Sequence, residues 1–201
     1  MSRLEVASIV NTILQSCTYI VFKENDPDAY LVDCGDPIPI IEYLEKNNKQ
    51  LKGVFLTHSH YDHIYGLHVI IKRYPRLTVY ASEQTLTGLN DSDMNMSYLY
   101  TDEEYRIMVK KSNSYVVDNN TRTRVLGEPV VCIRTPGHDL DCISYVIGNA
   151  IFTGDAYNPN SPVYTRWHNS NEAMAKRSED LLRQMISERE LDVYPGHLIE
   201  Y

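Results

Sequence analysis

The hydrophobic and polar positions of this 201-residue chain form two patterns, which are short apolar runs and longer segments with an apolar residue every three or four positions. Short apolar runs bounded by turn residues predict buried strands, and the longer periodic segments predict amphipathic helices. The strands are expected at residues 4–10, 18–23, 30–33, 53–57 and 78–81, near Tyr115, and at residues 122–126, 130–134, 143–147 and 150–153. The helices are expected at residues 39–47, 62–74, 82–89, 101–111 and 171–188. Because strands come first and then alternate with helices, the order favours an α/β fold of two sheets flanked by helices.

Three helix boundaries carry local signals of their own. Ser82 stands where a serine caps the first turn of a helix. Residues 101–104 form a capping box, in which Thr101 and Glu104 bond each other's backbone, and this box predicts a helix to about Lys111. Pro75 ends the helix that begins after residue 61, because proline cannot continue a helix.

Four metal-type ligands stand in one short stretch, after the apolar run at residues 51–57. They are His58, His60, Asp62 and His63. Residues two apart in an extended chain point to the same side, so His58 and His60 can bind one ion together. Asp62 and His63 follow where the predicted helix begins, so they can face a second ion. Buried imidazoles and carboxylates each need a partner, and such density therefore predicts a metal site.

Three more ligand types follow the same local pattern later in the chain. Each comes directly after an apolar run and a glycine: His138 after Gly137, Asp155 after Gly154, and His197 after Gly196. Glycine permits the turn and the close backbone approach that such a position needs. Sites in open α/β sheets form at strand ends, so we expect these side chains to converge with the first four.

The ordered set of these residues resembles the metallo-β-lactamase superfamily of metal-dependent hydrolases. The set is Asp33, His58, His60, Asp62, His63, His138, Asp155 and His197. The chain is most similar to the small glyoxalase II-like (hydroxyacylglutathione hydrolase-like) branch, through residues 57–66, 89–100, 135–138, 153–155 and 194–197. The resemblance implies a four-layer αββα sandwich with two mixed sheets flanked by helices, formed by residues 1–201 as a single domain.

The resemblance also implies a site for two divalent metal ions. It assigns His58, His60 and His138 to one ion, and Asp62, His63 and His197 to the other, with Asp155 bridging both. A donor set of nitrogen and oxygen suits zinc, which we expect, as well as iron or manganese. Asp33 is expected to orient a ligand imidazole, although an aspartate at this position is also typical of a turn.

The activity that the resemblance implies is hydrolysis of a small thioester or ester-like acyl substrate. A hydroxide that bridges the two ions would attack the substrate carbonyl, and Asp62 would orient it or accept its proton. The loop after Asp155 carries the candidate substrate contacts Tyr157, Tyr164, Arg166, Trp167 and His168, because aromatic rings with one cation can line a pocket. The alternative for Tyr164 and Trp167 is that they pin this loop to the sheet.

Two departures from the branch leave the substrate open. Residues 158–167 replace its usual Gly-Arg-x-Asp phrase, and Asp139-Leu140-Asp141-Cys142 replaces a small turn that contains glycine. One alternative function is a mononuclear iron(II) persulfide dioxygenase, whose ligands match His58, His138 and Asp155. Another is a non-catalytic metal-binding module on the same scaffold. A full set of seven ligands favours the two-metal hydrolase.

Composition narrows the possible partners to a small molecule. A formal net charge of −8 lacks the basic footprint of a nucleic-acid binder, and no apolar run is long enough to cross a membrane. The start of the chain lacks the pattern of a signal peptide, which also disfavours an exported β-lactamase. Cys17, Cys34, Cys132 and Cys142 fit buried, reduced thiols, so we expect a cytoplasmic protein. Because the sequence stops at Tyr201, we expect it to lack the helical extension that binds glutathione in glyoxalase II, and the sequence leaves its oligomeric state open.

Overall fold

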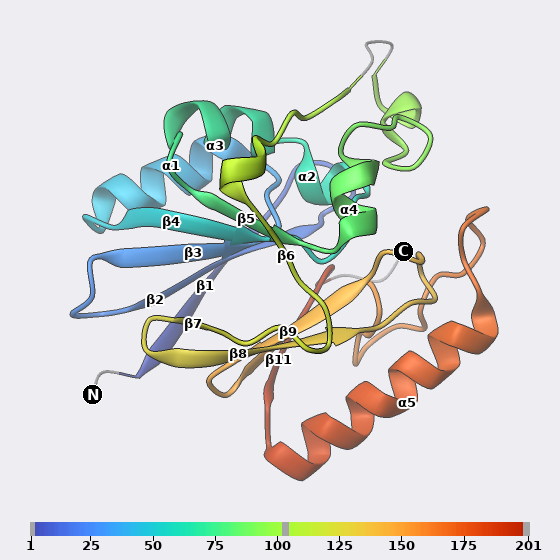
Figure 1. Cartoon of the computed structure of the whole chain (residues 1–201). Coiled ribbons are helices and arrows are strands. Elements are labelled where there is room, and N and C mark those ends of the chain that lie inside the picture. Colours follow the sequence, from blue (N-terminus) through green and yellow to red (C-terminus); the bar gives the residue numbers. More distant parts are fainter. Residues whose placement is uncertain (1–2, 102–104, 199–201) are drawn as a thin grey trace.

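The computed structural model describes residues 3–101 and 105–198, which form two mixed sheets (Figure 1). The first sheet has the strand order β1 (Leu4–Val10), β2 (Cys17–Lys23), β3 (Asp28–Val32), β4 (Gln50–Phe55), β5 (Thr78–Ala81) and β6 (Ser114–Val116). The second has the order β11 (Asp192–Pro195), β10 (Ala150–Gly154), β9 (Ile143–Ile147), β8 (Glu128–Arg134) and β7 (Thr123–Val125). Strands β3 to β6 pair in parallel, as do β10 and β11, and the remaining pairs are antiparallel.

Successive residues of the central strands pack into different layers, because side chains alternate between the two faces of a strand. On β4, Val54 packs into the outer core of the first sheet, while Phe55 packs between the sheets. The Phe55 ring meets the ring of Tyr145 from β9 edge-on, with centroids 5.1 Å apart. The continuous apolar runs of these strands therefore supply both faces of each sheet at once.

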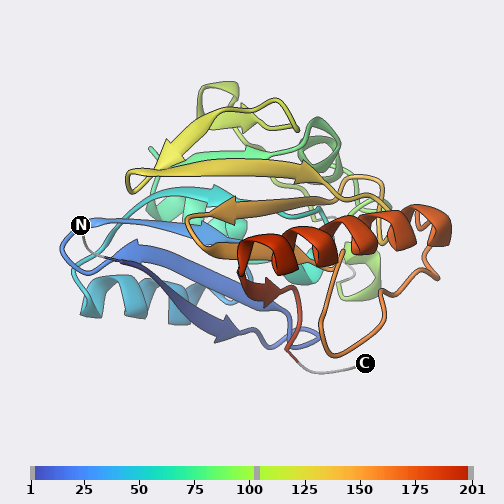
Figure 2. The same ribbon diagram turned by 90° about the horizontal axis from the view of Figure 1, so that it is seen from below.

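Helices cover the outer face of each sheet. The first sheet is covered by α1 (Pro37–Lys46), which buries Ile40 and Leu44, and by α3 (Leu67–Arg73). Figure 2 shows the long helix α5 (Glu172–Arg189) lying across the second sheet, where its Leu182 packs against residues such as Ile151. The predicted αββα sandwich is confirmed, and its four layers are helices, sheet, sheet and helix.

The predicted helix cap at Ser82 is present in the structure, and a second cap, not predicted as one, lies at Asn171. Ser82 accepts the Thr85 backbone N–H at 2.9 Å and begins α4 (Glu83–Gly88), while Asn171 caps α5 in the same way by accepting the N–H of Met174. Between α4 and β6, the chain forms two single turns of 3-10 helix, η1 (Ser97–Leu99) and η2 (Lys111–Asn113).

The predicted helix at residues 62–74 is wrong as a single element. The structure divides it into α2 (Tyr61–Ile64) and α3, with the break at Gly66. The Gly66 backbone lies against the turn that follows β3, so a β-carbon there would lie 1.8 Å from the Gly35 carbonyl oxygen. Its N–H bonds the Cys34 carbonyl at 3.1 Å instead of continuing the helical series.

The predicted helix at residues 101–111 is also wrong where the structure describes it. Residues 102–104, which hold most of the capping box, lie outside the described residues, and residues 105–110 have no regular secondary structure. Tyr105, Ile107 and Val109 pack on the outer core of the first sheet, which is a two-residue period. The Ile107 N–H also bonds the Leu89 carbonyl at 2.8 Å. These tertiary contacts outweigh the local capping signal.

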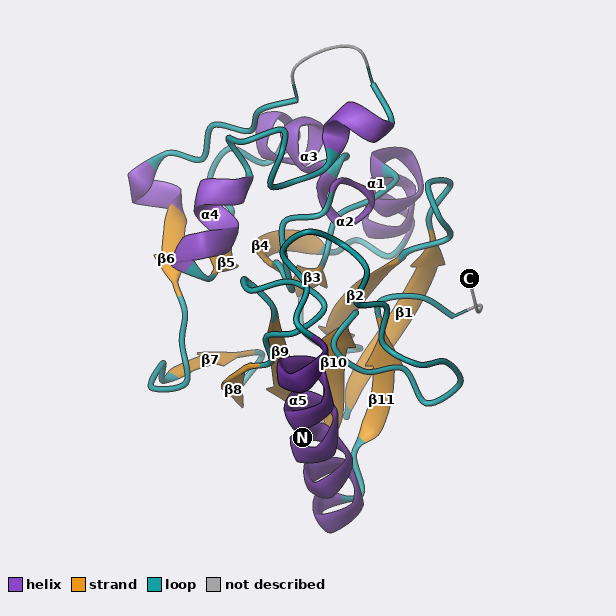
Figure 3. Cartoon of the chain, turned by 90° about the vertical axis from the view of Figure 1, so that its right-hand side faces the viewer, coloured by secondary structure: helices purple, strands orange, loops and turns teal. Residues whose placement is uncertain are grey.

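The loops that follow β4, β8, β10 and β11 carry the predicted ligands, and Figure 3 faces the side of the molecule where loops lie between the sheets. The four cysteines are all buried, in keeping with their apolar surroundings. Among residues 3–101 and 105–198, no helix has the length and apolar character needed to cross a membrane.

Candidate metal centre

All seven predicted ligand side chains meet at one place between the two sheets. His58 and His60 lie in the loop after β4, and Asp62 and His63 lie on α2. His138, Asp155 and His197 follow β8, β10 and β11. Three groups each bring three ligand atoms within 4.8 Å of one another: His58, His60 and His138; Asp62, His63 and His197; and His58, His63 and Asp155.

Glycine permits the closest approach in this cluster. Strands β10 and β11 run in parallel, so the loops that follow them leave the sheet side by side. A β-carbon on Gly196 would lie 2.0 Å from Asp155 Oδ1, and only glycine leaves room for that carboxylate. Gly154 has φ of +52°, which turns the chain sharply before Asp155.

Each imidazole has one ring nitrogen that points away from the cluster and meets a hydrogen-bond partner. The five contacts are His58 Nδ1 with Thr57 Oγ1 at 3.0 Å, His60 Nε2 with Asp139 Oδ2 at 3.1 Å, His63 Nδ1 with Asp33 Oδ2 at 2.9 Å, His138 Nδ1 with the Tyr164 carbonyl at 2.8 Å, and His197 Nδ1 with the Leu14 carbonyl at 3.0 Å.

These partners determine which nitrogen of each ring carries a hydrogen. A carbonyl or carboxylate oxygen can only accept, so the rings of His60, His63, His138 and His197 donate from their outer nitrogens. The Thr57 hydroxyl donates to Asp33 Oδ2 at 2.8 Å and therefore accepts from His58. A neutral imidazole in this arrangement leaves its inner nitrogen as an electron-pair donor, as metal-binding histidines require.

The inner atoms of the cluster lie close to one another, and the carboxylates of Asp62 and Asp155 stand among the ring nitrogens. His60 Nδ1 lies 3.1 Å from His138 Nε2, and His63 Nε2 lies 3.2 Å from His197 Nε2. His58 Nε2 and Asp155 Oδ1 are buried and form no hydrogen bond with any described residue. Lone pairs that converge in this way repel one another unless a cation lies between them. The donor atoms therefore fit divalent metal ions.

The two sides of the cluster differ in their electrostatics. Burial and the neighbouring His63 and His60 lower the pKa of His58, and burial also lowers the pKa of His138. On the other side, burial alone would lower the pKa of His197, but Asp155 and Asp62 raise it to about 9. The side that carries carboxylates therefore attracts positive charge.

Asp33 lies behind the cluster and connects two of its members. Its backbone has a left-handed conformation, with φ of 58°. Oδ1 accepts the Thr57 N–H at 2.8 Å, and Oδ2 accepts both the Thr57 hydroxyl and the His63 ring N–H. One carboxylate thus bonds His63 directly and His58 through Thr57.

Asp139 is a functional candidate that the sequence reading treated only as a departure from the family pattern. Its carboxylate is buried and accepts the outer N–H of His60, which lies 79 residues away in the sequence. The available signal was an acidic residue directly after the ligand His138, in a turn where a small residue was expected.

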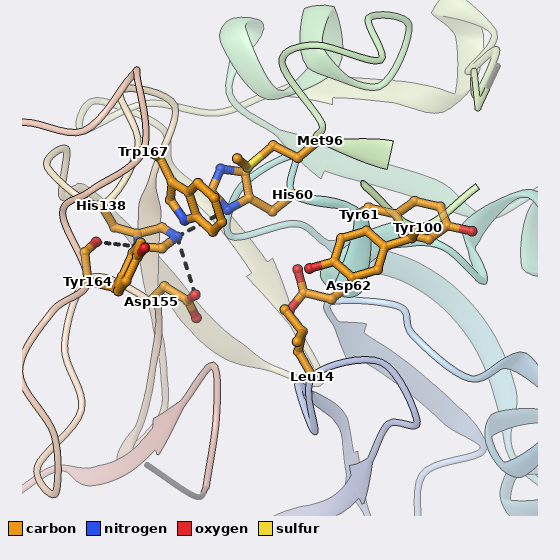
Figure 4. A pocket seen from close by; sticks show the side chains of 10 residues that line it. All are labelled: Leu14, His60, Tyr61, Asp62, Met96, Tyr100, His138, Asp155, Tyr164 and Trp167. Carbon is orange, nitrogen blue, oxygen red and sulfur yellow. Dashed lines mark hydrogen bonds and ion pairs between the residues drawn. The ribbon is translucent and has the colours of Figure 1, made fainter. Parts of the chain in front are cut away.

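A cavity of about 240 Å³ opens above the cluster (Figure 4). Its lining residues are Leu14, His60, Tyr61, Asp62, Met96, Tyr100, His138, Asp155, Tyr164 and Trp167. Among the predicted substrate contacts, Tyr164 and Trp167 line it. Leu14, Tyr61, Met96 and Tyr100 also line it, and no sequence pattern predicted them.

The other three predicted substrate contacts lie elsewhere. Tyr157 packs in the core beneath α5, with the Arg183 guanidinium 4.8 Å from its ring centre, because its side chain turns toward the helix. Arg166 and His168 are exposed and are not among the lining residues. Along residues 164–168, the side chains of Tyr164 and Trp167 are the ones that reach the cavity.

Comparison with known proteins gives a family and a fold. The family model for the metallo-beta-lactamase superfamily matches residues 11–197. The chain is 29% identical to a hydroxyacylglutathione hydrolase of Actinobacillus pleuropneumoniae serotype 5b (strain L20) over 142 residues, which are 70% of this chain and 50% of that protein. It spans about half the length of several such relatives.

Solved structures share its fold at lower sequence identity. The structure of BLEG-1 B3 metallo-beta-lactamase has a TM-score of 0.83 at 21% identity, and the match covers 96% of this chain and 91% of that one. The structure of TTHA1623 in a di-iron-bound form has a TM-score of 0.76 at 21% identity, with coverage of 96% and 92%.

Proposed function

The chain belongs to the metallo-β-lactamase superfamily, and we propose that it is a hydrolase that binds two divalent metal ions and cleaves a small thioester or ester-like acyl substrate. The observation that carries this proposal is the set of buried donor atoms that face one another between the sheets. A purely structural role for these imidazoles would require a hydrogen-bond partner for each inner nitrogen, and His58 Nε2 has none among the described residues.

The ligands divide between two positions in this proposal. His58, His60 and His138 hold one ion, and Asp62, His63 and His197 hold the other. Asp155 lies between them, with Oδ2 3.3 Å from His138 Nε2 and Oδ1 3.3 Å from His63 Nε2. Nitrogen and oxygen donors suit zinc, iron(II) and manganese, and we expect zinc. The relative solved in a di-iron-bound form supports two positions on this fold.

When bound, two such ions polarise a carbonyl and lower the pKa of a water molecule to about 7. We infer that Asp62 would accept a proton from the attacking water, because its carboxylate lines the cavity beside the cluster. Burial raises the pKa of Asp62, but the neighbouring His63 and His197 outweigh burial and hold the pKa below its ordinary value. Asp62 is therefore ionised and able to accept a proton at neutral pH.

The outer hydrogen bonds contribute orientation. They hold each imidazole so that its inner nitrogen points into the cluster. The acyl group of the substrate enters from the open side, where Tyr164 and Trp167 contact it.

Metal titration of the protein tests this proposal. Metal-free protein would be prepared with a chelator, and zinc, manganese or anaerobic iron(II) added back in steps while thioester hydrolysis is followed. We expect the rate to rise until two equivalents have been added. Absence of hydrolysis of thioesters and esters by protein that holds two equivalents would contradict the proposal.

The same preparation separates the dioxygenase alternative. One iron per chain, with oxygen uptake when a persulfide is added and no hydrolysis, would assign the chemistry to an iron site formed by His58, His138 and Asp155. The second group of three ligand atoms, from Asp62, His63 and His197, supports two ions rather than one.

A further inference from the structure

The cavity has a floor, which is the metal cluster, and walls, which are its other lining residues. The two differ in chemistry. Beyond the side chains of the metal cluster, every lining residue is aromatic or aliphatic: Leu14, Tyr61, Met96, Tyr100, Tyr164 and Trp167. Within the described part of the chain, none of the lining residues is a lysine or an arginine. At about 240 Å³, the cavity lies below the range of about 300–1,000 Å³ that is typical of ligand pockets, so it suits a small group.

Two aromatic pairs form the walls on opposite sides of the cavity. Tyr164 and Trp167 lie on the side of His138, with ring centroids 5.1 Å apart, while Tyr61 and Tyr100 stack at 5.6 Å on the side of Asp62 (Figure 4). Both pairs are anchored. The Trp167 ring meets His60 edge-on at 6.4 Å, and the Tyr61 ring meets Tyr105 edge-on at 4.7 Å. The walls are therefore formed before any ligand binds.

The rim of the cavity leaves apolar surface open to water. Leu14 is 42% exposed, Tyr100 39% and Tyr164 40%, although all three surround one opening. A ligand with an apolar group would cover this surface, which is favourable because apolar area leaves water.

The charges around the cavity disfavour an anionic ligand. A carboxylate bound between the walls would lose hydration without gaining a cation from them. The formal net charge of the chain is −8, which slows the approach of anions. Glutathione thioesters carry such carboxylates.

We propose that the preferred substrates are neutral acyl thioesters or esters in which an aryl or short alkyl group fills this cavity. This inference rests on the proposed hydrolase function of the same site and specifies its substrate class. In the reaction, the oxygen of water bonds to the carbonyl carbon, the carbon–sulfur or carbon–oxygen ester bond breaks, and the leaving thiol or alcohol takes a proton.

A matched series of thioesters tests the substrate class. Phenylacetyl, acetyl and succinyl thioesters of N-acetylcysteamine share one leaving group and differ only in the acyl part. We expect kcat/KM to be highest for phenylacetyl, lower by about tenfold for acetyl, which leaves the walls uncovered, and lowest for the anionic succinyl group. A succinyl thioester cleaved as well as the phenylacetyl thioester would overturn the inference while leaving the hydrolase function intact. Protein that cleaves none of the three thioesters would contradict the hydrolase function instead.

Binding to metal-free protein gives a second readout that does not depend on activity. Trp167 is the only tryptophan of the chain, so its fluorescence reports directly on the cavity. We expect saturable quenching or a spectral shift with neutral phenylacetamide and none with phenylacetate at the same concentration. Equal binding of the two compounds, or no binding of phenylacetamide, would overturn the inference even if thioesters are cleaved.

Two tyrosine variants locate the effect. Tyr100→Ala should weaken phenylacetamide binding and lower kcat/KM for the phenylacetyl thioester by about tenfold, with little change for the acetyl thioester. The matched control is Tyr115→Ala, since Tyr115 is 43% exposed but lies on the edge strand β6 and does not line the cavity. Equal losses of phenylacetamide binding and kcat/KM in the two variants would contradict the assignment of Tyr100 to the wall. If Tyr100→Ala does not fold, the comparison of phenylacetamide with phenylacetate on the wild-type protein still decides the question.

Discussion

The floor and the walls of the cavity are held in different ways. Every imidazole of the floor is positioned by one hydrogen bond from its outer nitrogen to a defined atom, such as Asp33 Oδ2 behind His63. The walls are positioned by ring contacts, and Tyr100 and Tyr164 remain about two-fifths exposed. Hydrogen bonds depend steeply on geometry, whereas apolar contacts tolerate small shifts.

This difference separates two properties of the protein. Changes in the floor should alter metal content and therefore abolish turnover for every substrate. Changes in the walls should alter the choice of substrate and leave the metal in place. Four substitutions test this separation, and a variant that moved both properties together would break it.

The largest effect is expected from Asp155→Ala. The variant lacks the carboxylate that lies between the two ligand groups and leaves His63, His138 and His197 without their common counter-charge. We expect most of the metal to be lost and the hydrolysis rate to fall by more than the factor of about 100 that loss of an outer partner can cost. Asp180→Ala on the exposed face of α5 is the control, and full metal content with full rate in Asp155→Ala would show that the assignment is wrong.

Asp33→Asn should follow in size. Asparagine offers one acceptor oxygen where Asp33 uses two, and its amide group would face the N–H and O–H donors of Thr57 and His63. We expect metal affinity to fall about 10–100-fold, measured by competition with a chelator. The free energy of unfolding should also fall by about 1–3 kcal/mol in urea titrations. Unchanged metal affinity would mean that Asp33 serves the turn alone.

Asp139→Asn should have a smaller effect on the floor, because Asp139 bonds only one of the five imidazoles. The asparagine can satisfy either the Leu140 N–H or the His60 ring, but not both as Asp139 does. We expect metal affinity to fall by about tenfold, with relative rates on different acyl groups unchanged. A change in acyl preference with unaltered metal affinity would show that Asp139 affects the choice of substrate, as the walls do, and not the binding of metal.

Asn95→Ala tests the walls and should leave the metal in place. Asn95 is fully buried, donates to the carbonyls of Gly88 and Tyr105, and accepts the Ser97 N–H at 2.9 Å. It thereby holds the turn at Met96, which has φ of 59° and lines the cavity. We expect a loss of about 1–3 kcal/mol in unfolding free energy and a reduced preference for large apolar acyl groups. Loss of metal from a folded Asn95→Ala variant would contradict the separation of floor and walls.

The sequence predicted the two sheets and the place where the ligand residues meet, because both depend on local patterns. Apolar runs define the strands, and strand ends in one sheet lie close together, so residues such as His138 and Asp155 are brought together by pattern alone. The amphipathic stripe of α5 was readable in the same way, because it packs on one face only.

The remaining features depend on contacts between distant segments. Asp139 meets His60 across 79 residues, and no local pattern signals that pair. The walls combine Leu14 from the β1–β2 loop with Tyr100 and Trp167 from loops far along the chain. The capping signal at residue 101 was strong locally. Tyr105 and Ile107 nevertheless pack on the outer core of the first sheet, and this packing outweighs the local signal for a helix.

Metal content per chain tests the central claim most directly. It would be measured by elemental analysis of protein purified without added metal, and the claim concerns the floor alone, so no substrate is needed. We predict about two equivalents of zinc, iron or manganese per chain, held by the seven converging side chains. Protein that is folded and carries no metal, and that takes up none when zinc, iron(II) or manganese is supplied, would contradict the account.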